Sequence, residues 1–104
     1  MTKIINIAII GLGQIGGYLY NELKIKKKDI ENKTGKTINI IAISAKNKNK
    51  KRKFKIDKKI FYQNPLKIFS NEKVDILFET IGLADGISKK IVETALKNKI
   101  NVIT

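Results

Sequence analysis

The chain has 104 residues, 42% of them hydrophobic, so it can form one cored domain; it shows no membrane-spanning run and no signal-peptide pattern, which predicts a cytoplasmic protein. It has no cysteine and no histidine, which excludes disulfides, cysteine-based metal or redox sites and the commonest general acid–base residue. The net charge of +13 comes mostly from lysine, but lysine is frequent along the whole chain together with isoleucine and asparagine and is not interleaved with aromatic residues, so we expect neither nucleic acid nor membrane as a partner.

The first predicted unit is a strand followed by a glycine-rich turn and a helix. Residues 4–10 form an apolar, isoleucine-rich run that is typical of a buried strand. After the turn, Ile15, Leu19 and Leu23 recur every four residues, which predicts an amphipathic helix over residues 14–32.

A second strand follows the first helix. Gly35 suits a left-handed end to the helix, and residues 37–43 are β-branched and apolar, as in a strand buried on both faces. Beyond a lysine-dense stretch over residues 46–59, residues 59–62 form a short strand candidate. Pro65 fits the first turn of a short helix that ends near Ser70, with Leu66 and Phe69 inward.

The last third repeats the alternation of strand and helix. Residues 74–79 predict a strand, Asp85 is a candidate N-cap for a helix over residues 86–98, and residues 100–104 begin a final strand. The helix carries an apolar stripe expected to face the core: Ile87, Ile91, Val92, Ala95 and Leu96. The order of elements predicts an α/β fold, a Rossmann-like doubly wound parallel sheet with helices on both faces, incomplete at its C-terminus.

The glycine turn is the strongest functional signal. Its sequence is Gly11-Leu12-Gly13-Gln14-Ile15-Gly16, a GxGxxG motif between a strand and a helix. In such a motif the first glycine permits the turn, the second lets a pyrophosphate approach the backbone, and the third lets helix and strand pack closely. The helix N-terminus then offers N–H groups and a positive dipole end to the phosphates. We therefore predict a dinucleotide site formed by residues 11–16.

The end of the second predicted strand indicates which dinucleotide binds. A free ribose 2′-hydroxyl is usually met by a carboxylate about 20 residues after the glycines, but Glu31 falls within the first helix and not at the strand end. The strand ends instead in Ser44 and Lys46, a hydroxyl and a cation that suit a 2′-phosphate. We predict NADP as the cofactor, with NAD possible. The lysines from Lys50 onward are interpreted as a solvated loop.

A third group of candidates lies after the strand at residues 74–79. Because carboxyl ends of parallel strands line the cofactor crevice, Thr80, Ile81 and Gly82 are predicted to lie beside the pyrophosphate and the nicotinamide ribose. An ordinary turn glycine is the alternative for Gly82. Glu79 has no partner that the sequence defines, so we interpret it as structural.

Taken together, the motifs resemble the N-terminal part of homoserine dehydrogenase, in order and spacing and over essentially the whole chain. The matching stretches are the isoleucine-rich strand with Gly-Leu-Gly-Gln-Ile-Gly-Gly, the long helix, residues 41–47, 64–66, 74–82 and 95–104. That family interconverts L-homoserine and L-aspartate 4-semialdehyde with NAD(P)H, a step toward threonine and methionine.

The resemblance implies roles for individual residues. Gly11 to Gly16 match the pyrophosphate loop, Lys46 falls where many members have an arginine that meets the adenosine phosphate, and Thr104 matches a threonine near the nicotinamide. The family continues after that threonine with Ala-Asn-Lys, whose lysine is implicated in hydride transfer, whereas Leu83 replaces a glycine common in the family.

We accordingly expect residues 1–104 to be the NAD(P)-binding domain of a longer enzyme, without its substrate and catalytic part, inactive alone and homo-oligomeric at full length. No catalytic residue and no metal ligand is assigned within the chain. Two other readings stay open. The chain could be the cofactor half of another two-domain dehydrogenase, or a non-catalytic nucleotide-sensing module. A basic nucleic-acid-binding module is a third reading, which predicts steep salt dependence of binding.

Overall fold

The computed structural model describes residues 3–46, 55–81 and 86–103. Five strands and four α-helices are assigned within these ranges. In chain order they are β1 (Lys3–Ile10), α1 (Gln14–Ile25), α2 (Lys27–Thr34), β2 (Lys36–Ser44), β3 (Phe61–Tyr62), α3 (Ile68–Asn71), β4 (Ile76–Glu79), α4 (Gly86–Lys97) and β5 (Asn101–Ile103). Two 3-10 turns, Lys58–Ile60 and Pro65–Lys67, precede β3 and α3.

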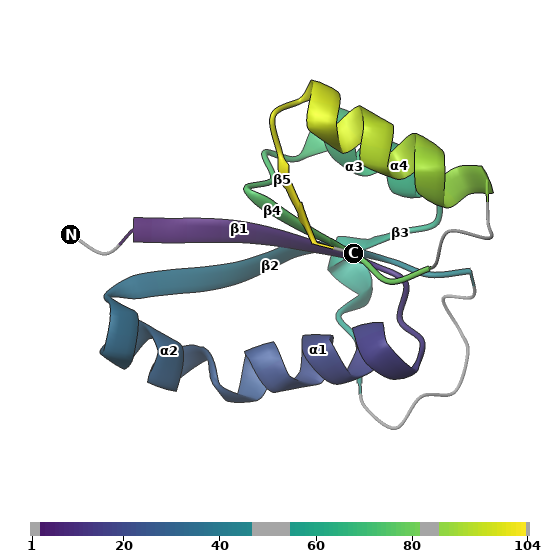
Figure 1. Ribbon diagram of the computed structural model, residues 1–104. Coiled ribbons are helices and arrows are strands. Elements are labelled where there is room, and N and C mark those ends of the chain that lie inside the picture. Colours follow the sequence, from purple (N-terminus) through teal and green to yellow (C-terminus); the bar gives the residue numbers. More distant parts are fainter. Residues whose placement is uncertain (1–2, 47–54, 82–85, 104) are drawn as a thin grey trace.

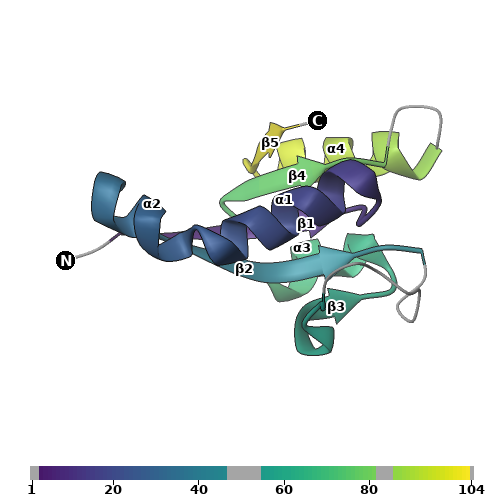
Figure 2. The ribbon, with the colours of Figure 1, turned by 90° about the horizontal axis from the view of Figure 1, so that it is seen from below.

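The strands form one parallel sheet in the order β3-β2-β1-β4-β5. Helices α1 and α2 lie on one face of this sheet and α3 and α4 on the other (Figure 1). Seen from the α1 side, α1 lies over the centre of the sheet, with β2 and β3 on one side of it and β4 and β5 on the other (Figure 2). This arrangement confirms the predicted doubly wound, Rossmann-like α/β fold.

Each face of the sheet carries its own core, because side chains alternate along a strand. Ala8 and Ile10 of β1 pack with Leu77, Ile91 and Ala95 on the side of α3 and α4. The intervening β1 residues and Ile43 pack on the other side against α1, around the buried Tyr20.

The predicted strands and helices are present, with shifted bounds. The first helix is interrupted at Lys26, whose φ of −94° and ψ of 7° separate α1 from α2, so the single helix predicted over residues 14–32 was wrong in that respect. The left-handed end at Gly35 is confirmed, with a φ of 71°. The predicted N-cap Asp85 lies outside the described residues.

Two predicted core positions face solvent. Ile15 is 74% exposed and Leu96 is 61% exposed, which corrects the expectation that both belong to inward stripes. Ser88, which was not expected to be buried, is fully enclosed in α4. Other stripe residues behave as predicted: Leu19 and Leu23 of α1 pack against the core around Tyr20, and Ile87, Ile91 and Ala95 of α4 pack in the core on the other face.

The pairing of β1 with β2 contains one irregularity. Ile7 pairs with Ile40, but Ala8 pairs with Ala42, so Ile41 is an extra residue on the β2 side. Such a bulge is unusual in a parallel pair. Ile41 and Ala42 both pack toward the α3 and α4 side, whereas Ile40 and Ile43 pack toward α1.

None of the helices in the described ranges is both long enough and apolar enough to cross a membrane.

Candidate functional site

The glycine turn leads directly from the end of β1 into the first turn of α1. Gly11 has a φ of 98°, a conformation that favours glycine, and its N–H donates to the Ser44 carbonyl at 2.7 Å. Gly13 is the N-cap of α1, and the Gly17 N–H donates to its carbonyl at 2.8 Å. The turn is thus tied to β2 on one side and closed by the first helical hydrogen bond on the other.

Gly13 leaves open space above the turn. A Cβ built on Gly13 meets no atom within 4 Å, and the residue is exposed. A Cβ on Gly16, by contrast, would collide with the Gly11 carbonyl and lie 2.6 Å from the Thr80 hydroxyl. The two glycines therefore serve different purposes: Gly13 leaves room on the outside, and Gly16 allows α1 to approach the β1 end and Thr80.

Among the described residues, the start of α1 carries neither a side-chain cap nor a negative charge of its own. Its N-cap is Gly13, which has no side chain to form a capping hydrogen bond, and its first turn contains no acidic residue. The positive end of this 12-residue helix is consequently available to an external anion. Leu12 is buried and contributes only its backbone to this surface, while Gln14 and Ile15 are exposed beside it. The structure thus groups the predicted residues 11–16 at the N-terminal end of α1. We call this end, formed by residues 11–16, the helix mouth.

The other predicted cofactor residues lie at the neighbouring strand ends. Ser44 ends β2 and is buried, and its hydroxyl donates to the Tyr62 carbonyl at 2.6 Å. That Ser44 contacts a 2′-phosphate stays a prediction. The Ser44 hydroxyl already donates its proton within the sheet, so it could meet the phosphate only by giving up that bond. Lys46 is exposed, and the Gln63 amide donates to its carbonyl at 3.0 Å. Within the described part of the chain, the Lys46 side chain is thus an exposed cation at this strand end.

Tyr62 of β3 connects the end of β2 to Glu72, the residue that follows α3. Its phenol donates to a carboxylate oxygen of Glu72 at 2.6 Å. This hydrogen bond is the main reason that the pKa of the Tyr62 phenol is raised above its ordinary value of 10.0, with desolvation adding to it.

The end of β4 holds a buried acid. Glu79 is 3% exposed, and one of its carboxylate oxygens accepts from the Ser88 hydroxyl at 2.8 Å and from the Ile81 N–H at 3.1 Å. These bonds tie the residues after β4 to the first turn of α4, which agrees with the structural role expected for Glu79. Ile81 is half-buried and lies close to Gly11: a Cβ built on Gly11 would be 3.3 Å from the Ile81 side chain.

Thr80 is drawn into the glycine turn itself. Its hydroxyl lies 2.8 Å from the Gly11 carbonyl oxygen and 3.1 Å from that of Ile10. The structure therefore brings together the first and third glycines with Thr80. Gly82 and Thr104, the remaining predicted cofactor residues, lie outside the described residues.

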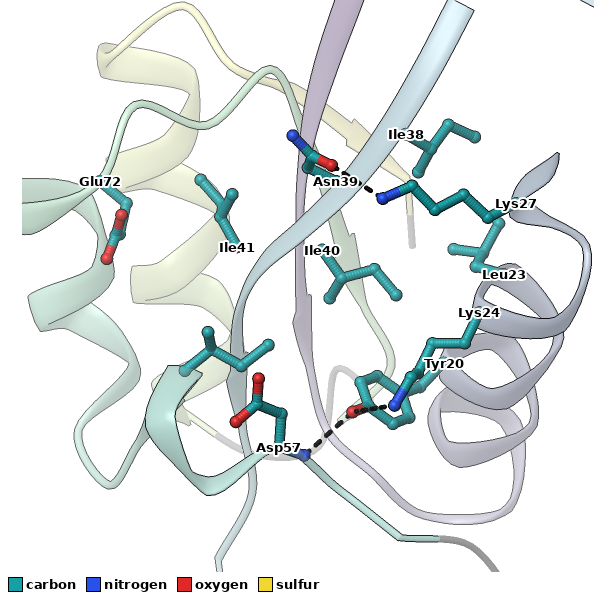
Figure 3. A pocket seen from close by; sticks show the side chains of 11 residues that line it. Tyr20, Leu23, Lys24, Lys27, Ile38, Asn39, Ile40, Ile41, Asp57 and Glu72 are labelled. Atoms are coloured by element: carbon teal, nitrogen blue, oxygen red, sulfur yellow. Dashed lines mark hydrogen bonds between the residues drawn. The ribbon is translucent and has the colours of Figure 1, made fainter. Parts of the chain in front are cut away.

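A separate hollow of about 520 Å³ lies on the side of α1 and α2, along the β2 edge (Figure 3). Its walls come from the second half of α1, the start of α2, residues 38–41 and the segment around Asp57, and it extends past β2 to Glu72, which follows α3. In Figure 3, Lys27 reaches over Asn39, and the two side chains are 3.1 Å apart. None of the residues predicted to bind cofactor lines this hollow, so it is distinct from the helix mouth.

Tyr20 forms one wall of the hollow and is a contact that sequence reasoning missed. It is 1% exposed, and its hydroxyl accepts from the Asp57 N–H at 3.0 Å, as drawn in Figure 3. The Lys24 ammonium lies 5.2 Å from the centre of its ring. Tyr20 thus fastens α1 to the segment that leads into β3. No local pattern indicates such a contact, because the two residues are 37 positions apart.

Comparison with known proteins agrees with this geometry. A homoserine dehydrogenase of Neisseria gonorrhoeae is 28% identical over 102 residues, which cover 98% of this chain and 23% of that protein. The crystal structure of S. aureus homoserine dehydrogenase at pH 6.5 superposes with a TM-score of 0.88 and 31% identity, over 100% of this chain and 26% of that one. A homoserine dehydrogenase structure from Thiobacillus denitrificans, at 22% identity and a TM-score of 0.76, shows the same fold.

The chain thus spans about a quarter of the length of these relatives, and it is similar to their N-terminal NAD-binding region. A family model described as an oxidoreductase family with an NAD-binding Rossmann fold matches residues 5–104. The glycine turn, the helix mouth and the sheet order are those expected of an NAD-binding Rossmann fold. The chain therefore belongs to this family of NAD-binding Rossmann-fold oxidoreductases.

Proposed function

We propose that the chain is the cofactor-binding part of an oxidoreductase that interconverts L-homoserine and L-aspartate 4-semialdehyde with NADPH or NADP. The observation that carries the binding half of this proposal is the uncapped N-terminus of α1 behind Gly13, where a Cβ would meet nothing within 4 Å. The substrate half is supported by the similarity to homoserine dehydrogenases over essentially the whole chain.

The residues at the helix mouth fit a dinucleotide pyrophosphate. Backbone N–H groups of residues 12–16 would hold the phosphates, with Gly13 giving the ligand access to the backbone. When bound, the nicotinamide supplies the hydride that such an enzyme transfers. What this chain contributes is binding and orientation of that cofactor, with Thr80, Ile81 and, as predicted from the sequence, Gly82 and Thr104 toward its nicotinamide half.

We infer a preference for NADP from the β2 end. Lys46 is exposed two residues beyond the strand, and Ser44, Ala45 and Lys46 include no carboxylate. A cation stabilises a ribose 2′-phosphate, whereas a carboxylate would accept from a free 2′-hydroxyl and repel the phosphate. Since the Ser44 proton is donated to Tyr62, the preference depends chiefly on Lys46.

We expect the 104-residue chain to bind cofactor without turning over homoserine. It has no histidine, and its buried acid Glu79 is engaged by Ser88 and Ile81. The sequence assigns no catalytic residue within residues 1–104, and the resemblance to homoserine dehydrogenase places the lysine implicated in hydride transfer in the segment that follows the threonine matched by Thr104 in that family. Measurable oxidation of homoserine by the chain alone would contradict this expectation.

The test is a titration of the chain with NADPH and with NADH, followed by intrinsic cofactor fluorescence or calorimetry. We expect tighter binding of NADPH, and Lys46→Glu should weaken NADPH binding much more than NADH binding. Lys55→Glu, an exposed lysine outside the predicted site, is the matched control and should change both affinities little. Binding of neither cofactor at millimolar concentration would refute the proposed function, and tighter NADH binding would refute the NADP preference.

A further inference from the structure

Thr80 belongs to the segment after β4, yet its hydroxyl bonds the backbone at the end of β1. The Gly11 carbonyl oxygen is 2.8 Å away and the Ile10 carbonyl oxygen 3.1 Å away, across 69 and 70 positions of sequence. The Thr80 N–H also donates to the Ile10 carbonyl at 3.0 Å. One residue thus fastens the start of the glycine turn to the neighbouring strand.

The same hydroxyl fills the space that two glycines leave vacant. A Cβ on Gly11 would lie 2.5 Å from the Thr80 oxygen, and a Cβ on Gly16 would lie 2.6 Å from it. Real Cβ atoms do not approach an oxygen so closely. The first and third glycines of the motif therefore admit Thr80 between the turn and α1, in addition to permitting the turn and the close packing of the helix.

The bond to Gly11 also fixes the direction of a neighbouring donor. The Gly11 carbonyl and the Leu12 N–H belong to one planar trans peptide and point in opposite directions. A carbonyl held toward Thr80 therefore turns the Leu12 N–H away from β4. Gly11, at a φ of 98°, has no side chain of its own to restrict this peptide, so the restriction comes from its neighbours: Gly16, against which the Gly11 carbonyl packs, and the Thr80 hydroxyl, which is the side-chain group bonded to that carbonyl.

We propose that Thr80 is a positioning residue for dinucleotide binding, which acts by holding the Gly11–Leu12 peptide in the orientation that presents its N–H to the pyrophosphate. This inference rests on the proposed function of the helix mouth. It assigns the Thr80 hydroxyl to the protein backbone, whereas the sequence alone suggested a place beside the ligand. The chemical class of the ligand is a diphosphate anion carried by a nicotinamide dinucleotide.

The test compares four variants of the chain. Thr80→Val replaces the hydroxyl by a methyl group, Thr80→Ala removes it without adding a group, and Thr80→Ser retains it. Thr94→Val is the matched control, because the Thr94 hydroxyl also donates to a carbonyl, that of Lys90 at 2.7 Å, within α4. For each variant, NADPH affinity, thermal unfolding and amide hydrogen exchange of residues 11–17 without ligand are measured.

We expect Thr80→Val and Thr80→Ala to bind NADPH about tenfold more weakly and to exchange the turn amides faster, since a hydrogen bond that orders the turn is lost. Thr80→Ser should stay within about twofold of the parent affinity, because it keeps the hydroxyl. Thr94→Val should alter neither affinity nor turn exchange.

The outcomes separate this inference from the proposed function. Unchanged turn exchange in folded Thr80→Ala, or equal loss of affinity in Thr80→Ser and Thr80→Ala, would overturn the role of the hydroxyl. If Thr80→Val does not fold, Thr80→Ala decides. If the parent chain binds neither NADPH nor NADH, the proposed function fails, and faster turn exchange in Thr80→Ala would still support the backbone role of Thr80 while removing its link to a dinucleotide.

Discussion

The Ser88 hydroxyl donates to a carboxylate oxygen of Glu79 at 2.8 Å, and both residues are enclosed, at 0% and 3% exposure. A buried carboxylate is costly unless donors surround it, so this bond stabilises the junction between β4 and α4. The same carboxylate oxygen accepts from the Ile81 N–H, which lies beside the glycine turn.

We therefore expect Ser88→Ala to lower the free energy of unfolding by about 1–3 kcal/mol, because Glu79 loses a donor that buried water cannot readily replace. Urea unfolding at neutral pH measures this change. Ser70→Ala is the control, since the exposed Ser70 hydroxyl donates only to the Lys67 carbonyl at 3.1 Å. Equal effects of the two substitutions would contradict the importance of the buried pair.

The glycine turn allows binding to be separated from folding. Gly16→Ala places a Cβ against the Gly11 carbonyl and should destabilise the chain by about 1–3 kcal/mol or more, as overpacking does. Gly13→Ala meets no atom within 4 Å and should change stability by less than about 1 kcal/mol, while its methyl group would occupy the approach that we propose for the pyrophosphate.

Thermal unfolding and NADPH titration of these two variants provide the measurement. A Gly13→Ala chain that keeps the parent melting temperature and binds NADPH as tightly as the parent would place the phosphates elsewhere. A Gly16→Ala chain as stable as the parent would show that α1 can move away from the turn without cost.

Tyr20 offers a test of how α1 is fastened to the segment before β3. Tyr20→Phe keeps the buried ring but removes the acceptor of the Asp57 N–H and of the more distant Lys24 ammonium at 3.5 Å, so we expect a loss of about 0.5–1.5 kcal/mol in unfolding free energy. Tyr18→Phe is the matched control on the same helix, because Tyr18 is 68% exposed. Chemical denaturation of both variants decides, and an equal effect would show that the Asp57 contact contributes nothing.

The Tyr62–Glu72 bond predicts a specific pH dependence. Because the pKa of the Tyr62 phenol is raised in the folded chain, its contribution to stability is fully present below pH 10.0, the ordinary pKa of tyrosine, and is lost as the pH rises through the raised folded value. Tyr62→Phe should therefore be less stable than the parent at pH 8, and the difference should shrink above pH 10.

Unfolding of the parent and Tyr62→Phe, each in urea at several pH values, measures that difference directly. Comparing the two chains cancels the titration of the many lysines, which affects both alike. A difference that is the same at pH 8 and above pH 10 would mean that the phenol proton does not contribute.

The strands, the helices and the glycine turn followed from the sequence because each depends on a local pattern. The isoleucine-rich runs, the GxGxxG motif and Gly35 act within a few residues of themselves. The prediction failed where a neighbour distant in sequence decides the outcome. Ile15 and Leu96 continue apolar stripes but face solvent, because how much of a stripe is covered depends on what packs beneath the helix.

In the candidate site, too, the sequence predicted what depends on a local pattern and missed the contacts between residues distant in sequence. The residues of the helix mouth were named from the motif, whereas the hydroxyl contacts of Ser44 and Thr80 were not. Ser44 and Tyr62 are 18 positions apart in the sequence, and Thr80 and Gly11 are 69 positions apart. No local spacing therefore predicts either hydrogen bond. The interruption at Lys26 has no pattern that we can identify in the sequence.

The extra residue at Ile41 has a consequence for everything that follows it in β2. Side chains in a strand alternate like odd and even numbers, and one additional residue exchanges the two sets. Ile43 consequently reaches the Tyr20 side, and Ser44 bonds the Tyr62 carbonyl. If β2 kept Ile41 but lost the irregularity, Ile43 and Ser44 would turn to the opposite faces, whereas deletion of Ile41 would pair Ala42 directly after Ile40 and leave both side chains on their present faces. The irregularity at Ile41 therefore decides which side chains the strand end nearest the expected adenosine presents on each face.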